Sequence, residues 1–165
     1  MKKEKEKSKG FHIVQNTREQ NPFKFDIEIY EDCLGTDIDT LKTGDYSIRG
    51  HECRLCIERK ASVSEIANNL GKEWDRFEKE LERMREYPHA FIICEFSVEE
   101  VFTYPSYNRF SKAVRDSIKT NGKFLMKRLM EIELEYNCKI LFCGNKLYAT
   151  KLTYSLMKRV HERYR

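Results

Sequence analysis

Gly44-Asp45-Tyr46-Ser47-Ile48 and Ile57-Glu58-Arg59-Lys60 are the two short segments that decide the fold of this chain. They fall in predicted strands at 45–49 and 53–59, and the polar residues around Gly50 between them are typical of a hairpin turn. Side chains two positions apart on a strand point to the same face, so Glu58 and Lys60 are expected to lie side by side. The hairpin brings the Asp45 carboxylate toward the same place.

Two carboxylates beside a lysine are suited to metal-dependent hydrolysis of a phosphodiester. Asp45 and Glu58 together can hold a hard divalent cation that keeps several of its waters. Such a cation polarises the phosphodiester and lowers the pKa of a bound water. The Lys60 ammonium can position or help to deprotonate that water, or stabilise the pentacovalent state. A surface ion pair is the competing interpretation of Glu58 and Lys60, because Glu-x-Lys often arises by chance.

Strands and helices alternate along the rest of the chain. Further strands are expected at 11–14, 90–94 and 139–143, and residues 23–30 alternate in a way that suits a strand or a short helix. Helices are expected at 65–86 with Ser62 or Ser64 as the N-cap, at 109–119, at 122–136 and from Asn145 to about residue 163. This order predicts an α/β fold with a mixed central sheet flanked by helices. We expect one domain over residues 11–165 after a disordered basic tail at 1–10.

Composition limits the class of protein. The 165 residues are 40% hydrophobic, so the chain can form a core although 35% of its residues are charged. No apolar run is long enough to span a membrane, and no apolar segment follows the Lys- and Glu-rich N-terminus. We therefore expect a cytoplasmic protein that does not associate with membranes.

Six cysteines are expected to be reduced in that setting. Cys53-x-x-Cys56, with His51 nearby, has the strongest metal-like spacing, but Cys138 and Cys143 do not supply a second pair at zinc-site spacing. Ordinary strand cysteines are the favoured interpretation.

Charge is distributed unevenly. The net charge of +4 combines +3 over residues 1–10, −8 over 11–103 and +9 over 104–165. The basic final third suits phosphate contact, although solvated helix faces would give the same pattern. Four basic residues at spacings of three, three and four would share one helix face, and a fifth follows: Arg109, Lys112, Arg115, Lys119 and Lys123. Nearby aromatic residues could stack on unpaired bases: Tyr104, Tyr107 and Phe110.

Several ordered motifs together resemble the XPF-type structure-specific nuclease family. The Asp45 and Glu58 segments resemble its central signature. Val14-Gln15-Asn16-Thr17-Arg18-Glu19 resembles the family's Asp-x-Arg-Glu, with Asn16 in place of the Asp. Residues 76–84 resemble a family helix and 90–95 its buried strand. The resemblance covers about residues 11–165 and implies a restriction-endonuclease-like fold.

The same resemblance implies a DNA endonuclease that uses Mg²⁺, or Mn²⁺ in its place, and acts on branched or flap-like DNA. It implies metal ligation by Asp45, Glu58, the main-chain carbonyl of Arg59 and the side chain of Asn16. The implied catalytic residues are Asp45, Glu58, Arg59, Lys60, Arg18 and Glu19. Arg76, on the family-like helix, is a further candidate for contact with nucleic acid. Family members commonly pair through their nuclease domains, so the resemblance also implies a homodimer.

Departures from the family pattern leave alternatives open. Asn16 carries no charge, so a catalytically degenerate nucleic-acid-binding or partner subunit with the same fold is the runner-up. Ser64 holds the place where the family usually has an Asp. No helix-hairpin-helix module follows in the sequence, which suits a compact form of the family. A sequence-specific restriction enzyme is a third, weaker interpretation.

Overall fold

A computed structural model describes residues 10–106 and 111–165, without the side chains of residues 115 and 116. Within these ranges one six-stranded sheet has the order β2-β1-β3-β4-β5-β6. Its strands are β1 (Phe11–Asn16), β2 (Cys33–Asp39), β3 (Tyr46–Ile48), β4 (Leu55–Lys60), β5 (His89–Cys94) and β6 (Cys138–Phe142). β3 is antiparallel to β1 and β4, whereas the β1–β2, β4–β5 and β5–β6 pairs are parallel. The prediction of a mixed central sheet is confirmed.

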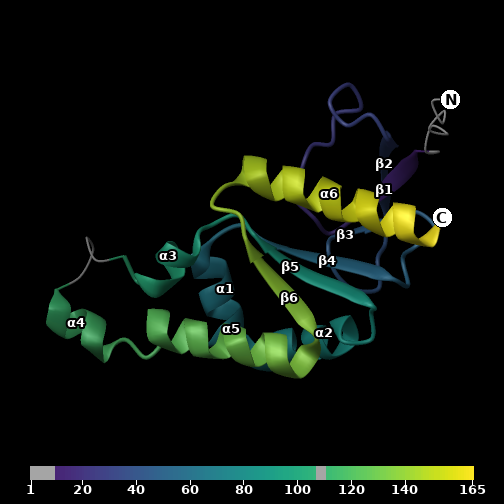
Figure 1. The fold of residues 1–165 in the computed structure, drawn as a ribbon. Coiled ribbons are helices and arrows are strands. Elements are labelled where there is room, and N and C mark those ends of the chain that lie inside the picture. Colours follow the sequence, from purple (N-terminus) through teal and green to yellow (C-terminus); the bar gives the residue numbers. More distant parts are fainter. Residues whose placement is uncertain (1–9, 107–110) are drawn as a thin grey trace, which may run out of the picture.

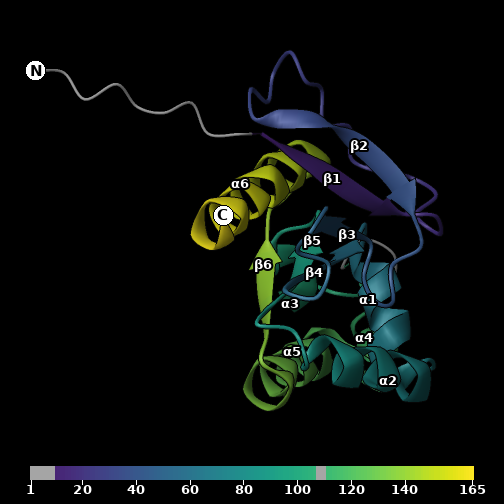
Figure 2. The same cartoon turned by 90° about the vertical axis from the view of Figure 1, so that its right-hand side faces the viewer.

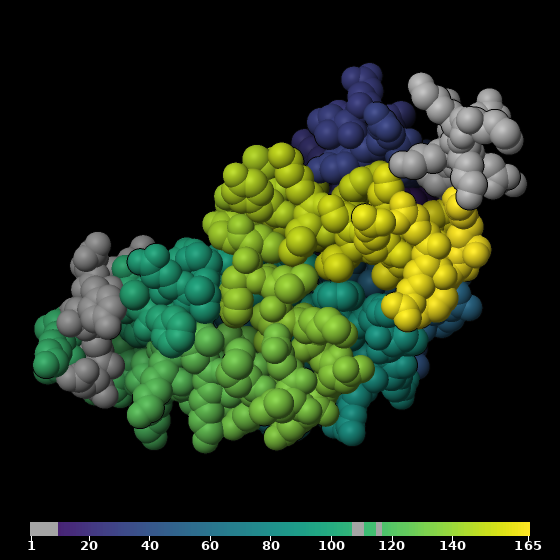
Figure 3. Space-filling view, viewed as in Figure 1, coloured from purple at the N-terminus to yellow at the C-terminus, as the bar shows by residue number. Residues whose placement is uncertain are grey.

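Helices cover both faces of the sheet. They are α1 (Val63–Leu70), α2 (Trp74–Met84), α3 (Val98–Phe102), α4 (Lys112–Ser117), α5 (Gly122–Tyr136) and α6 (Lys146–Tyr164). α6 lies on one face, and α1, α2 and α5 lie on the other (Figures 1 and 2). In the space-filling view, α6 forms the upper part of the surface and α5 the lower part (Figure 3). None of the helices in the described part of the chain is long and apolar enough to cross a membrane.

Alternation along the central strands divides the core into two halves. On β5, Ala90, Ile92 and Cys94 pack into the cluster under α1, α2 and α5, whereas Phe91 and Ile93 pack into the cluster under α6. This period of two is expected for a strand that is buried on both faces. The same alternation on β4 determines the face of the sheet on which each of its charged side chains lies.

The predicted single helix at 65–86 is wrong, because the structure has two helices there. α1 ends at Leu70 and α2 begins at Trp74, with Gly71 as the C-cap of α1. Glycine is unfavourable inside a helix by about 1 kcal/mol relative to alanine, so it favours a break. The apolar residues of both helices nevertheless face the same core, which is why the pattern looks continuous.

Two elements were not expected from the sequence, and one ambiguous segment is irregular. β2 is an edge strand in which only Cys33 is buried. Its exposed positions include Leu34 and Ile38, so its sequence lacks the apolar alternation that marks a half-buried strand. α3 is a short helix after Ser97. Residues 23–30 form neither a strand nor a helix, yet Phe23 and Phe25 are both buried in the cluster under α6. Their alternation reflects packing of an irregular segment.

Several local predictions hold. β3 and β4 form the predicted hairpin through Gly50, whose φ is +84°. Ser62 is the N-cap of α1, and Asn145 is the N-cap of α6. The helix expected at 109–119 is shorter, since α4 begins at Lys112 and ends at Ser117, and Arg109 lies outside the described residues. Residues 1–9 of the expected basic tail also lie outside them.

Candidate active site

Alternation on β4 sends Glu58 and Lys60 to one face of the sheet and Arg59 to the other. The neighbouring Cys56 packs under α1, α2 and α5, whereas Leu55 and Ile57 pack under α6. Glu58 and Lys60 are both buried, and Lys60 Nζ donates a 2.7 Å hydrogen bond to Glu58 Oε1. The predicted juxtaposition of these two side chains is therefore present, and it lies on the α1/α2 side.

The Gly44-Asp45 segment brings a second carboxylate to the same side. Gly44 has a φ of +80°, and a Cβ at this residue would lie 2.7 Å from Cys56 Sγ. Only glycine has neither the steric nor the conformational obstacle to this approach. The Asp45 N–H donates to the Ile57 carbonyl at 2.7 Å, and Asp45 Oδ2 accepts from the Arg59 N–H at 2.8 Å. Asp45 is thus fixed against β4 by backbone contacts on both sides of Glu58.

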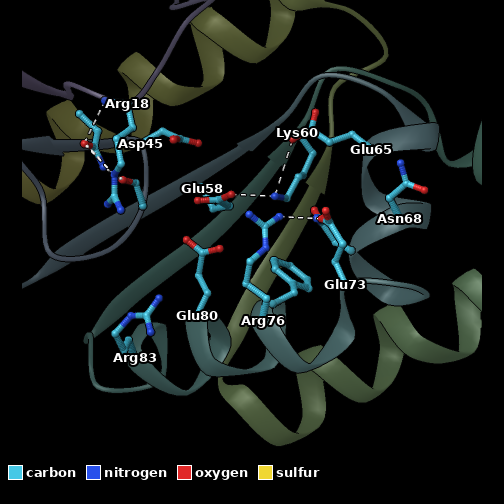
Figure 4. Close-up of a pocket in the computed structure, with 14 residues that line it drawn as sticks. Arg18, Asp45, Glu58, Lys60, Glu65, Asn68, Glu73, Arg76, Glu80 and Arg83 are labelled. Carbon is cyan, nitrogen blue, oxygen red and sulfur yellow. Dashed lines mark hydrogen bonds and ion pairs between the residues drawn. The ribbon is translucent and has the colours of Figure 1, made fainter.

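These side chains line a cavity of about 460 Å³ between the sheet and the first two helices (Figure 4). One wall comes from β1, the loop after it, the segment before β3, and β4: Asn16, Arg18, Asp45, Glu58 and Lys60. The opposite wall consists of residues from α1, α2 and the turn between them: Glu65, Asn68, Asn69, Glu73, Arg76, Phe77, Glu80 and Arg83. The cavity therefore holds the buried Glu58 carboxylate and the half-buried Asp45 carboxylate, with further charged groups around them.

Burial and mutual repulsion change the pKa values of the charged groups in the cavity. Burial and the neighbouring Glu58 carboxylate raise the pKa of Asp45 to about 7. Burial also raises the pKa of Glu58 to about 7, against the opposing effect of the Lys60 ammonium. Burial alone would lower the pKa of Lys60, but the Glu58, Glu65 and Glu80 carboxylates together outweigh it and the net shift is upward. The pair of carboxylates is electrostatically unfavourable at neutral pH without a cation beside it.

Asn16 lies at the end of β1, where the family pattern has an Asp. Its side chain is buried, and Nδ2 donates to the Gly44 carbonyl at 2.7 Å. Oδ1 accepts longer bonds from the Arg18 N–H and Nε, at 3.3 and 3.4 Å. Both ends of the Asn16 amide are therefore engaged with neighbouring protein groups.

Two arginines are anchored to the segment that precedes Gly44. Arg18 donates from Nη2 to the Leu41 carbonyl at 3.2 Å, and Arg83 donates from Nε to Thr43 Oγ1 at 3.0 Å. Both side chains line the cavity, and their remaining N–H groups are available to an anion on the Asp45 side. Arg83 was not predicted. Its place on the family-like helix, seven residues after Arg76 and so on the same helix face, was the available signal.

Glu19 and Arg59, predicted with the catalytic group, lie instead in an ion cluster that does not line the cavity. Arg59 Nη1 bonds to Glu19 at 3.2 Å, and Arg59 Nε bonds to Glu95 at 2.5 Å. The three side chains are almost fully buried, and the Phe23 ring lies 5.4 Å from the guanidinium. The backbone N–H of Arg59 contributes to the cavity by its hydrogen bond to Asp45. The Arg59 side chain instead links the loop after β1, through Glu19, to the end of β5, through Glu95.

The residues predicted to bind nucleic acid fall in two places. Arg76 lines the cavity, where it is paired with Glu73 at 2.6 Å. Lys112, Lys119 and Lys123 are exposed and do not line it. α4 lies at the end of the molecule opposite the C-terminal end of α6 (Figure 1). Arg109 and the side chain of Arg115 lie outside the described part of the chain.

The donors in the cavity fit a hard cation better than zinc. In the described ranges no cluster of three or more His, Cys, Asp or Glu side chains is arranged to enclose a metal ion. Cys56 is buried on β4, while Cys53 is exposed in the preceding turn. Two carboxylates in a roomy, polar cavity suit Mg²⁺ or Mn²⁺, because Mg²⁺ is commonly held by one or two carboxylates and keeps several waters.

Comparison with known protein families shows which family this chain belongs to. Residues 15–156, most of the chain, match the ERCC4 domain. The chain belongs to the ERCC4 domain family. The match includes Asn16, Asp45, Glu58 and Lys60, so the candidate site lies inside the family's domain. Comparison with curated proteins gave no match.

Two solved structures share the fold of this ERCC4 domain. XPF from Aeropyrum pernix superposes with a TM-score of 0.63 at 19% identity, over 92% of this chain and 66% of the other. XPF from Aeropyrum pernix in complex with DNA superposes with a TM-score of 0.61 at 20% identity, over 94% of this chain and 66% of the other. This ERCC4 domain thus spans just under two thirds of each solved chain. The predicted XPF-type, restriction-endonuclease-like fold is confirmed.

Proposed function

We propose that this ERCC4 domain is a divalent-metal-dependent endonuclease that hydrolyses phosphodiester bonds of DNA at branched or flap-like structures. One observation carries the proposal. Asp45, from the segment just before β3, and Glu58, from β4, line one cavity together with Lys60, whose Nζ lies 2.7 Å from Glu58. A structural ion pair would need only one carboxylate. The presence of a second carboxylate, such that Glu58 raises the pKa of Asp45, is better explained by a cation that binds between them.

Asp45 and Glu58 would hold Mg²⁺, or Mn²⁺ in its place. When bound, the cation would lower the pKa of a coordinated water and neutralise negative charge on the phosphate. The backbone of the protein prepares this arrangement, because the Arg59 N–H fixes Asp45 Oδ2 on the hairpin. A carboxylate held in this way loses little further conformational freedom on binding the ion.

Lys60 serves as a charged donor in this proposal. The upward shift of its pKa means that Nζ carries its proton at neutral pH, so it is poorly suited to act as a base. From its position beside Glu58 it can orient the attacking water or stabilise charge on the phosphoryl oxygens. The sequence left open whether Lys60 acts as a base or positions the water, and the raised pKa favours the second role.

DNA as the substrate rests on the family and on the charges around the cavity. Arg18, Arg83 and Arg76 place N–H donors at its rim, where phosphates on either side of the scissile bond would lie. Such contacts recognise the backbone and its shape and carry no base sequence. Branched DNA and a homodimer are carried over from the XPF-type family. The DNA complex of a similarly folded protein supports DNA as the ligand.

A cleavage panel tests the proposal. End-labelled flap, splayed-arm and plain duplex DNA are each incubated with the protein in Mg²⁺, Mn²⁺ or chelator. We expect metal-dependent cutting of the branched substrates and a loss of at least about 100-fold in Asp45→Asn. Asp75→Asn, an exposed acid on α2 outside the cavity, is the control and should cut like the wild type.

Two other outcomes would replace this proposal. Binding of flap DNA without cutting in any metal would support the non-catalytic partner subunit. Cutting of plain duplex at fixed sites would support a sequence-specific restriction enzyme.

A further inference from the structure

Asn16 contacts the loop that carries Asp45 through both its backbone and its side chain. Its N–H donates to the Asp45 carbonyl at 2.8 Å, and its Nδ2 donates to the Gly44 carbonyl at 2.7 Å. The side chain is buried, with 1% of the residue exposed. Two consecutive carbonyls of the loop are thus held by one residue at the end of β1.

The network fixes the orientation of the amide. Oδ1 faces two donors, the Arg18 N–H and Nε, whereas Nδ2 faces a carbonyl. Turning the amide over would set Oδ1 against the Gly44 carbonyl and Nδ2 against the Arg18 donors. The short bond to Gly44 therefore depends on an N–H donor at this position.

An ionised aspartate cannot supply that donor. Both of its oxygens are acceptors only, so one of them would face the Gly44 carbonyl in a buried setting without a proton between them. A buried polar group that loses its partner destabilises the fold, and here a further negative charge would be added beside Asp45. Asn16 is therefore not equivalent to the aspartate that the family pattern has at this place.

We infer that Asn16 is a positioning residue, whose amide holds the Gly44-Asp45 segment in place, and that it does not ligate the cation. This inference rests on the proposed function in one respect, since the segment is positioned for metal binding by Asp45. It also reverses the simplest expectation for Asn16→Asp. The simplest expectation is that Asn16→Asp supplies a missing metal ligand. We expect instead that it makes the stability of the fold depend on a cation that offsets the added negative charge.

Thermal unfolding separates the two roles. In chelator, Asn16→Asp should lower Tm by on the order of 5 °C or more, because a buried hydrogen bond is lost and a like charge is gained. Asn68→Asp adds the same charge at an exposed position that lines the same cavity, and it should change Tm by less than about 2 °C. Equal Tm values for the two variants in chelator would overturn the inference.

Side-chain NMR of the full chain supplies a readout that does not depend on activity or on stability. In metal-free protein, the Asn16 NH₂ should show a scalar coupling across its hydrogen bond to the Gly44 carbonyl carbon. On addition of Mg²⁺, the Asp45 carboxyl carbon should shift, while the Asn16 amide carbon and the coupling stay unchanged. Loss of the coupling together with a shift of the Asn16 amide carbon would show ligation and overturn the inference.

The failure of the proposed function would look different. If Mg²⁺ shifted neither Asp45 nor Glu58 while the coupling to Gly44 was present, the metal site would be disproved. The positioning of Gly44-Asp45 by Asn16 would still be supported.

Discussion

The Arg59 backbone N–H donates a 2.8 Å hydrogen bond to Asp45 Oδ2, although the Arg59 side chain belongs to the opposite face of the sheet. One residue thereby links two charged clusters on the two faces of β4. Its backbone orders the candidate metal site, and its guanidinium joins Glu19 and Glu95. A charged residue within a motif can thus act on the site without its side chain entering the cavity.

The side chain of Arg59 is predicted to stabilise the fold. Arg59→Met leaves the buried Glu19 and Glu95 carboxylates without their cation, so the free energy of unfolding should fall by about 3 kcal/mol. Arg49→Met also breaks several ion pairs, but those pairs are exposed and screened by solvent, so the loss should be much smaller than for Arg59→Met. Urea denaturation measures both variants. A loss for Arg59→Met no larger than that for Arg49→Met would contradict the buried cluster.

Gly44 is predicted to be irreplaceable for steric reasons as well as for its backbone conformation. Gly44→Ala should lower the free energy of unfolding by about 3 kcal/mol, since the new Cβ would also lie 3.0 Å from the Ile57 carbonyl. Gly50 has a similar φ of +84°, but a Cβ at this residue would have no neighbouring atom within 4 Å. Gly50→Ala should therefore cost only about 1 kcal/mol. Equal losses in chemical denaturation would show that the close approach at Gly44 does not matter.

The metal-free protein is predicted to lose stability as the pH rises. Asp45 and Glu58 have pKa values of about 7 in the fold, against ordinary values of 3.8 and 4.5. The folded state therefore binds more protons than the unfolded state between about pH 4 and pH 7, and stability falls with rising pH across that window. From pH 5 to pH 8 we expect a loss on the order of 5 kcal/mol for the two groups together.

Denaturation in chelator at several pH values measures this slope. Asp45→Asn should reduce the slope by about half, because the variant removes one of the two carboxylates, while burial still raises the pKa of Glu58. Asp75→Asn should keep the wild-type slope. A wild-type stability that is constant or rises from pH 5 to pH 8 would contradict the unfavourable pairing of Asp45 with Glu58.

Arg83 is predicted to contact phosphate, and Lys112 is its matched comparison. Arg83→Ala should weaken binding of flap DNA by about 5- to 10-fold and lower the slope of log K against log salt concentration by about 1. Lys112→Ala, on α4 outside the cavity, should change affinity less than about 2-fold. Fluorescence anisotropy in chelator, over a range of salt concentrations, measures both. The reverse order of effects would move the DNA path to the basic segment near α4.

Much of the sheet and the central part of the site could be predicted from the sequence. Glu58 and Lys60 share a face because a strand repeats every two residues, and the turn at Gly50 brings Asp45 to them. These relationships are local or span a single hairpin. The two buried strands β5 and β6 were evident from their short apolar runs.

What sequence reasoning missed depends on contacts between distant segments. β2 pairs in parallel with β1 at the edge of the sheet, and its apolar residues Leu34 and Ile38 are exposed, so its sequence does not mark an inward face. Arg83 enters the site because Thr43 lies beside the end of α2, a contact 40 positions apart in the chain. α3 is different, because the capping box of Ser97 and Glu100 was visible in the sequence and could have revealed it.

Calorimetric titration of the metal-free protein with Mn²⁺ tests whether Asp45 and Glu58 hold a divalent cation. We expect saturable binding to the wild type and to Asp75→Asn at pH 7.5. We expect affinity at least about 10-fold weaker in both Asp45→Asn and Glu58→Gln, since each variant removes one of two charged ligands. Equal Mn²⁺ affinity in all four proteins, or no binding to the wild type, would contradict a cation site at Asp45 and Glu58.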